Sequence, residues 1–551
     1  MIIEKAKGRY CYANVKLTSE ATQHLSSLPG FSKWVGRKMM FAPTGANIKH
    51  IQKYWPSAEW DDDSKSILEE YIKSLKAADD KIKFSVPEND DYMFETKPFD
   101  HQRKAFYMSR DKKNFALLME QGTGKTKVII DNAAYLYANN KITALVVIAP
   151  NGVHRNWLNN EIPFHLPEWC HRRTAYYYSG MKKQDLENWS FVQSSDDSLK
   201  IFAFNVEGFV SKKAQAMMES LMRTEDVMLV VDESSRIKRP GAKRTKFITK
   251  IGKQAKYRRI LTGTPVTKGP EVVYSKFAFL DPYILGYESF YSFRARYCIM
   301  GGYENRQIVA YENVDELTKS IEGHSFRILK KDCLDLPEKI YQRAYVDLSE
   351  AQRRLYNTMK DEWVADYQEE TIEAPEAITR LLRMQQITCG WFPSENPVPI
   401  DDKNPRIELL KEILSEIDGK AIIWARFRAD LKLIENELAG MAVSYHGGVS
   451  NDDRMKAVDD FQNNPKVKYF IGQPQSGGIG LTLTAASYAI YYSNSFDLEV
   501  RLQSEDRCHR IGTTNNVTYI DIEANKTIDK KIIKALRDLI TRDPMSIFME
   551  S

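Results

Sequence analysis

A short glycine-containing run that ends in lysine and threonine separates an apolar segment from a helix-length segment. Phe115 to Met119 predicts a buried strand, and Thr126 to Tyr137 predicts a helix. The run between them contains Gly122, Thr123, Gly124, Lys125 and Thr126. Glycines let the backbone fold around a phosphate, so that N–H groups and the helix N-terminus point at the anion. We therefore expect a phosphate-binding loop in which Lys125 reaches the β- and γ-phosphates of a nucleotide and the Thr126 hydroxyl binds Mg²⁺.

This loop departs from the strict phosphate-loop pattern at one position. The pattern has a glycine five residues before Gly124, where this chain has Met119. A Gly-Lys-Thr triplet is common by itself, but its position between a strand and a helix lowers the chance of coincidence to roughly one in ten.

Two adjacent carboxylates, Asp232 and Glu233, directly follow the apolar segment Val227 to Val231. A carboxylate at the C-terminal end of a parallel strand lies at the edge of the sheet where ligands bind. Asp232 could hold Mg²⁺ through its water shell, and Glu233 could orient and deprotonate an attacking water. An acidic cap of the next helix is the alternative, and only the pairing with Lys125 favours the metal and base roles.

Arg507 and Arg510 lie one helical turn apart in Arg-Cys-His-Arg, so both can project from one face. Charge that develops on a γ-phosphate needs such donors, and arginine supplies a planar fork that lysine lacks. A basic surface pair is the common alternative. Because most of the chain separates the pair from Lys125, we expect these arginines to belong to a second lobe whose closure completes the site.

Short apolar runs recur along the chain in two series, separated by helix-length segments. The first series contains Phe115–Met119, Leu145–Ile148, Ile201–Phe204, Val227–Val231 and Arg259–Thr262. The second contains Ala421–Trp424, Met441–Tyr445, Lys468–Ile471, Tyr488–Tyr492 and Val517–Asp521. Continuous apolar strands that alternate with helices indicate parallel sheets buried on both faces. Two series therefore predict two α/β lobes.

The segments outside these series complete the expected organisation. Residues 270–404 show helical periodicity without strand signals, as in Ser349–Met359 and Glu376–Gln386, and predict a helical insertion. The acidic, Pro-containing stretch Val86–Asp91 predicts a linker. The expected regions are an N-terminal domain at 1–84, a linker at 85–98, the first lobe at 99–269, the inter-lobe region at 270–404 and the second lobe at 405–551.

Length and composition agree with several soluble domains. The 551 residues suffice for several domains of ~100–200 residues, and 43% hydrophobic residues can build their cores. No apolar run approaches the ~18 residues that cross a bilayer, and the N-terminus lacks a signal-peptide pattern. The six cysteines form no Cys-x-x-Cys pair, which disfavours structural zinc and a disulfide framework. We therefore expect a non-secreted, non-membrane protein with reduced thiols.

The distribution of charge is more informative than the net charge of +5. Ser234 to Pro270 contains twelve Lys or Arg residues and no Asp or Glu. A solvated face is the ordinary interpretation of such a block. Beside a phosphate-binding loop, we interpret it as a surface that faces a polyanion.

In this order, these elements resemble superfamily 2 helicases, specifically the Swi/Snf-type double-stranded DNA translocases. The resemblance covers about Lys97 to Lys534, and its motifs are specific. Beyond the three elements above, they are Phe99-Asp-His-Gln102, Ala149 to Trp157, Leu261-Thr-Gly-Thr-Pro265, Phe279-Leu-Asp-Pro282, Phe290 with Arg294 to Tyr297, Gly477-Gly-Ile-Gly-Leu481 with Thr484-Ala-Ala486, and Gln503 to Gly512. The resemblance implies an α/β fold with two RecA-like lobes, parallel sheets, a helical insertion and a small N-terminal α+β domain. It also implies an ATP- and Mg²⁺-dependent motor that tracks DNA.

The same resemblance assigns roles to further residues. It places Gln102 near adenine, and Gln503 with the nucleotide. Contacts to DNA, or coupling of hydrolysis to those contacts, fall to Pro150, Asn151, Arg155, Thr262, Thr264, Gly477 and Gly478.

Three departures from the family pattern bear on coupling rather than on catalysis. The family usually has Asp-Glu-Ala-His, whereas this chain has Asp232-Glu-Ser-Ser235, which weakens a link that the histidine normally makes to the final motif. Gln475-Ser-Gly-Gly478 replaces Arg-Ala-Gly-Gly and lacks one charge, and Thr482 replaces a common asparagine. No catalytic group is missing, so we expect an active enzyme.

The N-terminal block combines basic and aromatic residues. Residues 21–58 contain no Asp or Glu. The basic residues there are Lys33, Arg37, Lys38, Lys49 and Lys53, and the aromatic ones are Phe31, Trp34, Phe41, Tyr54 and Trp55. Such a composition suits base stacking with phosphate neutralisation, although most of the rings are expected to be core. The block is similar to the substrate-recognition module of HARP-type annealing helicases and phage branch-migration helicases, which implies DNA binding through Lys33, Arg37 and Lys38.

The leading hypothesis is an ATP-dependent translocase that remodels branched DNA, by fork reannealing or branch migration. Its expected partners are double-stranded and branched DNA, bound by a monomeric motor in the cytoplasm of a bacterial or phage-infected cell, or in a eukaryotic nucleus. The alternatives are a translocase that displaces bound proteins and a DNA-binding scaffold without hydrolysis. An RNA helicase is disfavoured by the motif wording.

Overall fold

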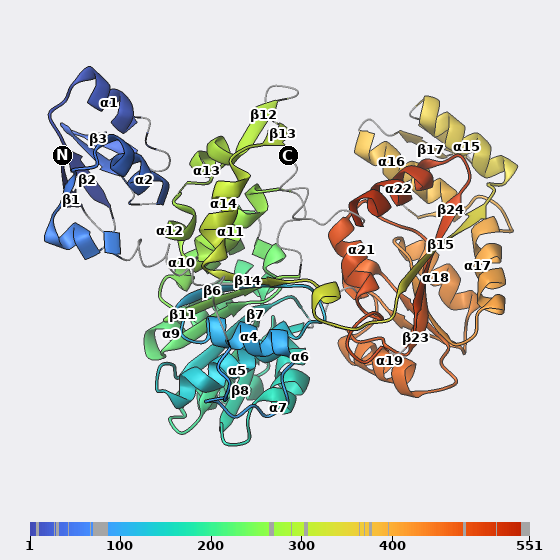
Figure 1. Ribbon diagram of the computed structural model, residues 1–551. Coiled ribbons are helices and arrows are strands. Elements are labelled where there is room, and N and C mark those ends of the chain that lie inside the picture. The colour runs from blue at the N-terminus through green and yellow to red at the C-terminus, as the bar shows by residue number, and fades with distance from the viewer. Residues whose placement is uncertain are drawn as a thin grey trace. The chain divides into compact units, whose positions relative to one another are not determined.

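The protein divides into two compact units, Met1–Cys333 and Leu334–Asp543, in the computed structural model (Figure 1). The structure describes the chain except for residues 7–9, 27, 29–31, 42, 44, 67, 70–85, 152, 238, 264–268, 288, 302–306, 363, 368–369, 374–376, 395, 478–480, 514 and 541–551. Within the described ranges, no helix is long and apolar enough to cross a membrane.

A seven-stranded parallel sheet forms the centre of the first lobe. Its strand order is β14-β6-β11-β10-β7-β9-β8. The strands are β6 (Asn114–Met119), β7 (Ala144–Ala149), β8 (Arg172–Tyr177), β9 (Leu199–Asn205), β10 (Val227–Val231), β11 (Tyr257–Leu261) and β14 (Ser325–Ile328). The helices of this unit are α4 (Asp100–Ser109), α5 (Lys125–Ala138), α6 (Val153–Asn156), α7 (Ile162–His165), α8 (Lys183–Ser194), α9 (Lys212–Thr224), α10 (Lys243–Gly252), α11 (Glu271–Leu280), α12 (Pro282–Leu285), α13 (Phe290–Tyr297) and α14 (Val314–Glu322), with the hairpin β12 (Cys298–Gly301) and β13 (Gln307–Tyr311). The five apolar runs of the first series all form strands of this sheet, as the sequence predicts.

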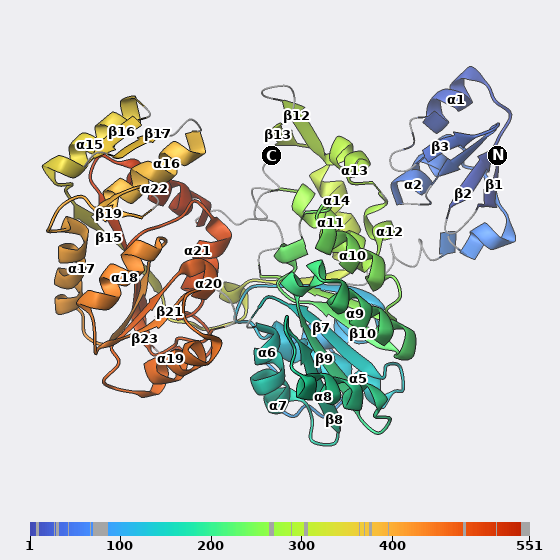
Figure 2. The same ribbon diagram turned by 180° about the vertical axis from the view of Figure 1, so that it is seen from behind.

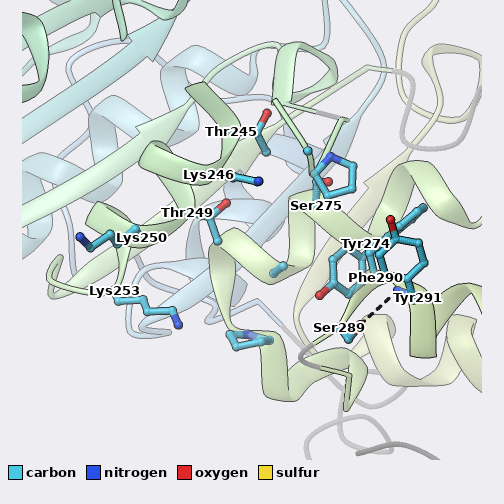
Figure 3. Close-up of a pocket in the computed structure, with 14 residues that line it drawn as sticks. Thr245, Lys246, Thr249, Lys250, Lys253, Tyr274, Ser275, Ser289, Phe290 and Tyr291 are labelled. Carbon is cyan, nitrogen blue, oxygen red and sulfur yellow. Dashed lines mark hydrogen bonds between the residues drawn. The ribbon is translucent and has the colours of Figure 1, made fainter. Parts of the chain in front are cut away.

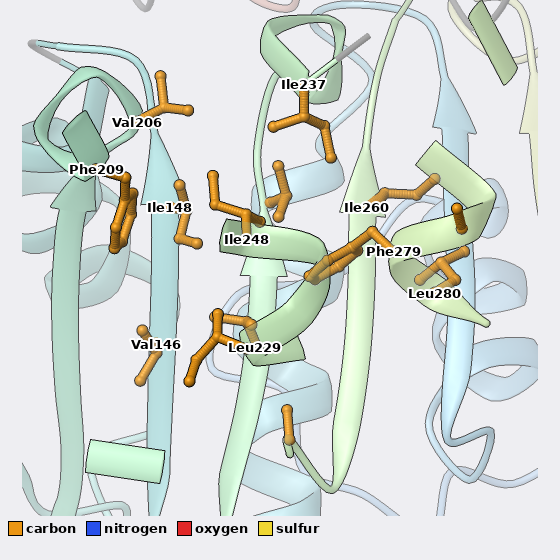
Figure 4. Packing of buried hydrophobic residues seen from close by; sticks show 14 of the residues in the cluster. Val146, Ile148, Val206, Phe209, Leu229, Ile237, Ile248, Ile260, Phe279 and Leu280 are labelled. Atoms are coloured by element: carbon orange, nitrogen blue, oxygen red, sulfur yellow. The ribbon is translucent and has the colours of Figure 1, made fainter. Parts of the chain in front are cut away.

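The core of the first lobe lies between one face of this sheet and the helices α8 to α11 (Figure 2). Val146, Leu229 and Ile260 point from three neighbouring strands into this layer, where Ile248 of α10 and Phe279 of α11 meet them (Figure 4). The approach of α10 to α11 is close enough to require a glycine. A Cβ on Gly252 would lie 2.7 Å from the Phe279 ring, closer than such atoms pack. Removal of a buried ring such as Phe279 typically costs about 3–5 kcal/mol of stability.

The N-terminal block forms its own small sheet with the helices α1 and α2, and residues 62–66 are helical as well. The strand order is β3-β4-β2-β1-β5, and an apolar core that includes Ile3, Leu25 and Phe41 lies against it. The elements are β1 (Ile2–Lys5), β2 (Cys11–Asn14), α1 (Ser19–Ser26), β3 (Ser32–Val35), β4 (Lys38–Phe41), α2 (Gly45–Tyr54) and β5 (Glu59–Trp60). This arrangement agrees with the expected small α+β domain.

The second unit is built on a six-stranded parallel sheet with the order β15-β24-β23-β20-β22-β21. Its strands are β15 (Lys339–Val346), β20 (Lys420–Trp424), β21 (Ala442–Tyr445), β22 (Tyr469–Gly472), β23 (Ala486–Tyr491) and β24 (Val517–Ala524). The helices are α15 (Glu350–Asp361), α16 (Ala377–Thr388), α17 (Pro405–Glu416), α18 (Arg428–Glu437), α19 (Asn451–Asn463), α20 (Pro474–Gly477), α21 (Leu498–Glu505) and α22 (Ile528–Ile540). Two short hairpins join β16 (Val364–Tyr367) to β17 (Glu370–Glu373) and β18 (Trp391–Phe392) to β19 (Val398–Pro399).

The region expected to be a purely helical insertion also supplies strands to both sheets. Within residues 270–404, β14 joins the edge of the first sheet and β15 joins the edge of the second. The expected absence of strand signals was therefore wrong for these two segments. The helices predicted at Ser349–Met359 and Glu376–Gln386 correspond to α15, which Ser349 caps, and to α16.

The acidic stretch interpreted as a linker is instead fastened to the first lobe. Asp91 accepts hydrogen bonds from two guanidinium nitrogens of Arg110, at 2.5 and 2.7 Å. Tyr92 is buried against the Phe106 ring, and its hydroxyl donates to Asp131 at 3.3 Å. The aromatic residue after the acidic run anchors it, so residues 90–92 belong to the lobe rather than to a free connection.

Candidate nucleotide-binding site

Strand order brings the predicted nucleotide motifs to one edge of the first sheet. In the neighbouring strands β6, β11, β10 and β7, the carboxyl ends lie on the same side because the pairings are all parallel. The glycine-containing loop follows β6, Thr262 follows β11, Asp232 follows β10 and Pro150 follows β7. Residues from four separate parts of the sequence therefore share the edge where open α/β sheets bind ligands.

The loop between β6 and α5 has the backbone that a phosphate site needs. Gly122 and Gly124 have φ of +77° and +86°, in the left-handed region that favours glycine. Lys125 is buried, and its ammonium donates to the carbonyls of Met119 at 2.8 Å and Glu120 at 3.0 Å. Met119, which stands where the strict pattern has glycine, contributes its main-chain carbonyl to this contact. Lys125 would exchange these carbonyls for phosphate oxygens on binding a nucleotide.

Gln102 and His101 hold this loop from α4. The Gln102 side chain accepts from Phe99 N at 3.1 Å and donates to Thr123 O at 3.1 Å, and His101 Nε2 lies 2.8 Å from the same carbonyl. A Cβ at Gly124 would lie 2.1 Å from Gln102 Nε2, so a larger residue there would displace the Gln102 side chain from the loop. Gln102 thus fixes the loop, while its contact with adenine stays a prediction.

Asp232 is a buried carboxylate that two donors hold in place. Its Oδ2 accepts from the Trp157 indole at 2.8 Å, and its Oδ1 accepts from Glu233 N at 2.8 Å. Burial raises the pKa of Asp232 above its ordinary value, whereas Trp157 and the nearby Lys125 counteract that rise. Each oxygen keeps a lone pair beyond its one hydrogen bond, and hard cations prefer oxygen ligands. The donor set of Asp232 with the half-buried Thr126 hydroxyl therefore fits a Mg²⁺ ion that also binds phosphate.

Glu233 has a strained backbone and a polar neighbour. Its φ is +46°, which is uncommon for a residue with a side chain. Gln121 Nε2 donates to Glu233 Oε1 at 3.2 Å and thus links the carboxylate to the phosphate-binding loop. Such strain concentrates at functional sites because the surrounding structure must hold it. A carboxylate held beside the loop suits the predicted role in orienting water.

In the second unit, Arg507 and Arg510 converge on one carbonyl. Arg507 donates from Nε to Gln503 O at 2.9 Å and from Nη1 to Leu481 O at 3.3 Å. Arg510 Nη1 donates to Leu481 O at 3.3 Å and to Thr482 Oγ1 at 2.9 Å. Both arginines therefore point to one side, but α21 ends at Glu505, so a turn rather than a helix places them there.

A buried charge network fixes the segment that carries these arginines. Glu505 is fully buried and accepts from Lys339 at 3.1 Å, Tyr341 at 2.8 Å and Arg501 at 2.8 Å. Burial alone would raise the pKa of Glu505, but Lys339 and Arg501 hold it below its ordinary value. Arg501 also pairs with the buried Asp521. Loss of one partner in such a network leaves an unpaired buried charge, at a cost of about 3–5 kcal/mol.

Two models of known protein families match this chain, and the first of them extends past the boundary between the two units. The model of the SNF2-related domain matches residues 100–390, more than half of the chain, and that of the helicase conserved C-terminal domain matches residues 405–512.

The chain belongs to the SNF2-related family.

Individual relatives match about three quarters of this chain. The DNA annealing helicase and endonuclease ZRANB3 of Bos taurus is 26% identical over 448 residues, which are 78% of this chain and 38% of that protein. The protein of the same description from Homo sapiens is 26% identical over 426 residues, or 74% of this chain and 36% of the relative. The CHD3-type chromatin-remodeling factor PICKLE of Arabidopsis thaliana is 25% identical over 452 residues, or 75% and 31%. The chain thus spans less than two-fifths of the length of these relatives.

Among solved structures, the Sulfolobus solfataricus SWI2/SNF2 ATPase core in complex with dsDNA is 23% identical. It covers 85% of this chain and 97% of its own, with a TM-score of 0.38.

The serine pair that departs from the SNF2-type motif lies in a short 3-10 helix, Ser234–Ile237. Ser234 is fully buried, and among the described residues its hydroxyl has no hydrogen-bond partner. Ser235 is buried as well. The pair therefore packs into the first lobe, and the role that a longer histidine would have there remains a prediction.

The predicted DNA-contacting residues differ in their access to solvent. Asn151 is exposed, and Arg155 is half-buried with its guanidinium over the rings of Tyr176 at 5.0 Å and Tyr178 at 5.7 Å. Thr262 is fully buried, and Pro150 is buried too, while their roles in DNA contact or in its coupling to hydrolysis stay predictions. Gly477 ends α20, whereas Thr264 and Gly478 lie outside the described residues.

The N-terminal candidates gather on one hairpin. Lys33 and Trp34 of β3 and Arg37 of the turn are exposed, while Lys38 of β4 pairs with Glu4. Of the aromatic residues, Phe41 is core, but Trp34 is 37% and Tyr54 38% exposed. Most of the five rings were expected to be core. Phe41 is core and Trp55 is partly buried against the same core, whereas Trp34 and Tyr54 are exposed and Phe31 lies outside the described residues.

Three positioning residues escaped prediction from the sequence. They are Trp157, which donates to Asp232, His101, which lies against Thr123 O, and Gln121, which donates to Glu233. The sequence motifs contain or adjoin these residues but do not predict the contacts. The segment after β7 lies near Asp232 because β10 and β7 are neighbours in the sheet, and local sequence does not predict which strands are neighbours.

Proposed function

We propose that this protein is an ATP-dependent double-stranded DNA translocase that remodels branched DNA. The observation that carries the proposal is the assembly of Lys125, Asp232 and Glu233 at one sheet edge of an SNF2-related domain. A helicase C-terminal domain with Arg507 and Arg510 follows in the same chain. These residue types match the requirements of phosphoryl transfer to water.

Each group has a distinct task in the proposed reaction. Lys125 leaves the loop carbonyls to bind the terminal phosphates, and Glu233 orients the attacking water and accepts its proton. Asp232 and Thr126 hold Mg²⁺, which neutralises charge on the phosphates when bound. Arg507 and Arg510 act on the charge that develops during hydrolysis, because their forks can bind several oxygens.

The choice of branched DNA rests on two supports. The ZRANB3 relatives carry the description of annealing helicases, at low identity and over part of their length. The exposed Lys33, Trp34 and Arg37 of the N-terminal hairpin combine charge with an aromatic ring. Most contacts to DNA would go to phosphates and depend strongly on salt.

Displacement of DNA-bound proteins is the second candidate. The PICKLE relative is described as a chromatin-remodeling factor and matches a similar share of this chain. Its motor would be the same, and only the substrate that stimulates it would differ.

Phosphate release in the presence of single strands, linear duplex, forks and four-way junctions tests the proposal. We expect stimulation by duplex and stronger stimulation by branched DNA. Lys125→Ala should abolish turnover and leave DNA binding intact, because the lysine contacts phosphates of the nucleotide. Lys141→Ala, an exposed lysine of the same lobe, is the control. No stimulation of phosphate release by any of these DNAs would favour the scaffold without hydrolysis, and retained turnover in Lys125→Ala would refute the site.

A further inference from the structure

A groove on the first lobe lies between α10 on one side and α11 to α13 on the other (Figure 3). Its volume is about 610 Å³, in the range of pockets that hold a small organic molecule or one nucleotide. No residue assigned to the ATP site lines it. The groove lies within the first unit, and every residue that lines it belongs to the described part of the chain.

One wall of the groove is basic. Lys246 and Lys250 lie four residues apart on α10, with Thr249 beside them, and Lys253 follows the end of the helix. Lys246 and Lys250 share one helix face because they are four residues apart, and Lys253 lines the groove as well. All three lysines are exposed, and the described residues that line the groove include no Asp or Glu. This wall attracts an anion.

The opposite wall is aromatic. Tyr274 of α11 lies 5.5 Å from Phe290 of α13, measured between ring centroids, and Tyr291 lies 6.1 Å from Phe290. Tyr291 is 72% exposed, whereas Tyr274 is buried, so the cluster begins in the core and ends in solvent. The guanidinium of Arg294 lies 5.4 Å from the Tyr291 centroid and adds positive charge to this wall.

The carboxylates near the groove are engaged elsewhere. Asp281 accepts from Tyr283 N at 3.0 Å and caps α12. Glu219 lies with Arg223 in a separate small cavity on the other side of Lys250. The basic block of the sequence is also not one uniform surface, because Arg259 is fully buried and donates to Ser109 O at 2.7 Å. The basic block from Ser234 to Pro270 therefore cannot be one continuous surface that faces a polyanion. Its exposed lysines on and after α10 remain candidates for such a surface.

The pairing of an exposed ring with a lysine row fits one ligand class better than others. Single-stranded nucleic acid presents a base face for stacking and phosphates at regular intervals. In a duplex the base faces are stacked on each other and unavailable to Tyr291. An acidic peptide would use the lysines and leave the aromatic wall without a planar partner.

We propose that the groove between α10 and α13 binds a segment of single-stranded DNA, with a base on Tyr291 and its phosphates along Lys246, Lys250 and Lys253. The inference deepens the proposed function, on which it rests, because remodelling of branched DNA exposes single strands. The groove would hold such a strand away from the duplex that the motor tracks.

Binding of a fluorescent oligothymidylate to the full chain without ATP tests the groove, with a blunt duplex measured in parallel. The variants are Tyr291→Ala, Tyr291→Phe, and the triple exchange Lys246→Ala, Lys250→Ala and Lys253→Ala. A control exchange removes three exposed lysines elsewhere on the same lobe, Lys182→Ala, Lys212→Ala and Lys213→Ala. Circular dichroism establishes that each variant is folded.

We expect Tyr291→Ala to weaken oligothymidylate binding by roughly tenfold, and Tyr291→Phe to keep it, since stacking needs the ring and not the hydroxyl. The triple lysine exchange should make single-strand binding less dependent on salt. The slope of the logarithm of the binding constant against the logarithm of the salt concentration should become shallower by about two units. Free thymidine monophosphate should compete only weakly, because one phosphate meets one or two of the three lysines. Duplex binding and duplex-stimulated phosphate release should stay unchanged in all groove variants.

Several outcomes would overturn the groove proposal. They are unchanged oligothymidylate binding in Tyr291→Ala, equal losses in the control exchange, equal losses for duplex, and complete competition by free thymidine monophosphate. Absence of duplex-stimulated phosphate release in the unmodified protein would instead refute the proposed function. The failure of the groove proposal and the failure of the proposed function are therefore distinguishable.

Discussion

The proposed role of Asp232 in holding Mg²⁺ requires an ionised carboxylate, whereas burial favours the neutral acid. Its two hydrogen-bond donors, Trp157 and the backbone of Glu233, stabilise the carboxylate and oppose the effect of burial on the pKa. A hydrogen bond to a charged group stabilises the charged form by about 1.5–3 kcal/mol, which corresponds to a pKa difference of about one to two units. Trp157 is therefore a positioning residue with a measurable electrostatic consequence.

Trp157→Phe should move the acidic limb of the pH–rate profile for DNA-stimulated ATP hydrolysis to higher pH by about one unit. The exchange keeps an aromatic ring and removes the N–H donor, so the pKa of Asp232 rises and the active carboxylate is lost at a higher pH. Trp189→Phe, another buried tryptophan of the same lobe, is the control and should leave the limb in place. Coincident profiles for the two variants would show that the indole does not tune Asp232.

Arg510→Ala should slow hydrolysis by roughly 100-fold or more while changing ATP affinity only slightly. The reason is that its proposed interaction forms with charge that develops in the transition state. Single-turnover hydrolysis at saturating ATP separates this effect from binding, and Arg354→Ala provides an exposed arginine of the same unit as control. Equal rates for the variant and the unmodified protein at saturating ATP would contradict the role.

At the scale of elements, the loop before α5 depends on two glycine properties at one position. Gly124 has a positive φ, and its Cα faces Gln102 at a distance that leaves no room for a methyl group. Gly180 has a similar φ of +83° but has nothing within 4 Å of the place where a Cβ would lie. The two positions therefore separate backbone strain from steric contact.

Gly124→Ala and Gly180→Ala should each lower the free energy of unfolding by about 1–2 kcal/mol, because both place a side chain in the left-handed region. Gly124→Ala should in addition abolish nucleotide binding, since the methyl group displaces Gln102 and reshapes the loop. Urea denaturation and titration with a fluorescent ATP analogue measure the two effects. Nucleotide binding that is equal in both variants would remove the Gln102 contact from the site.

The sequence predicts the interior of each sheet better than its edges. All ten apolar runs are strands. Nine of them lie inside the two sheets, where parallel strands are buried on both faces and read as continuous apolar segments, and the tenth, β21, is an edge strand. The three missed strands, β8, β14 and β15, lie at sheet edges, where one side contacts solvent and polar residues interrupt the pattern. Edge strands carry weaker signals because their packing demands are smaller.

Site prediction divides along a similar line. Lys125, Asp232 and Glu233 could be proposed for the nucleotide site from the sequence because local spacing encodes a strand followed by a loop with fixed chemistry. Trp157 and Gln121 were missed as partners because their contacts depend on strand order and tertiary distance. Thr262 was assigned to DNA by motif alone, and its complete burial became evident only from packing.

At the scale of the whole molecule, the N-terminal domain has the features of a recognition module with its own core. Its hairpin exposes Lys33, Trp34 and Arg37, and the Trp34 indole donates to Ser26 Oγ at 3.3 Å, which orients the ring. Gly36 forms the turn with φ of +62°. Because β3 is the edge strand of its sheet, a nucleic acid can approach this side without displacing other strands.

The triple exchange Lys33→Ala, Trp34→Ala and Arg37→Ala should lower the preference for forks over linear duplex by roughly tenfold, the effect expected from one lost stacking contact with its charges. ATP hydrolysis stimulated by linear duplex should stay unchanged, since none of these residues belongs to the nucleotide site. Lys16→Ala, Leu17→Ala and Lys65→Ala remove two exposed cations and one exposed apolar residue from the same domain and serve as control. Affinities for a fork and for a duplex of equal length, measured at one salt concentration, give the ratio directly. A full fork preference in the hairpin variant would assign fork recognition to the motor itself. Among the described residues of the domain, the other exposed ring is Tyr54, which already stacks on His24 at 3.8 Å.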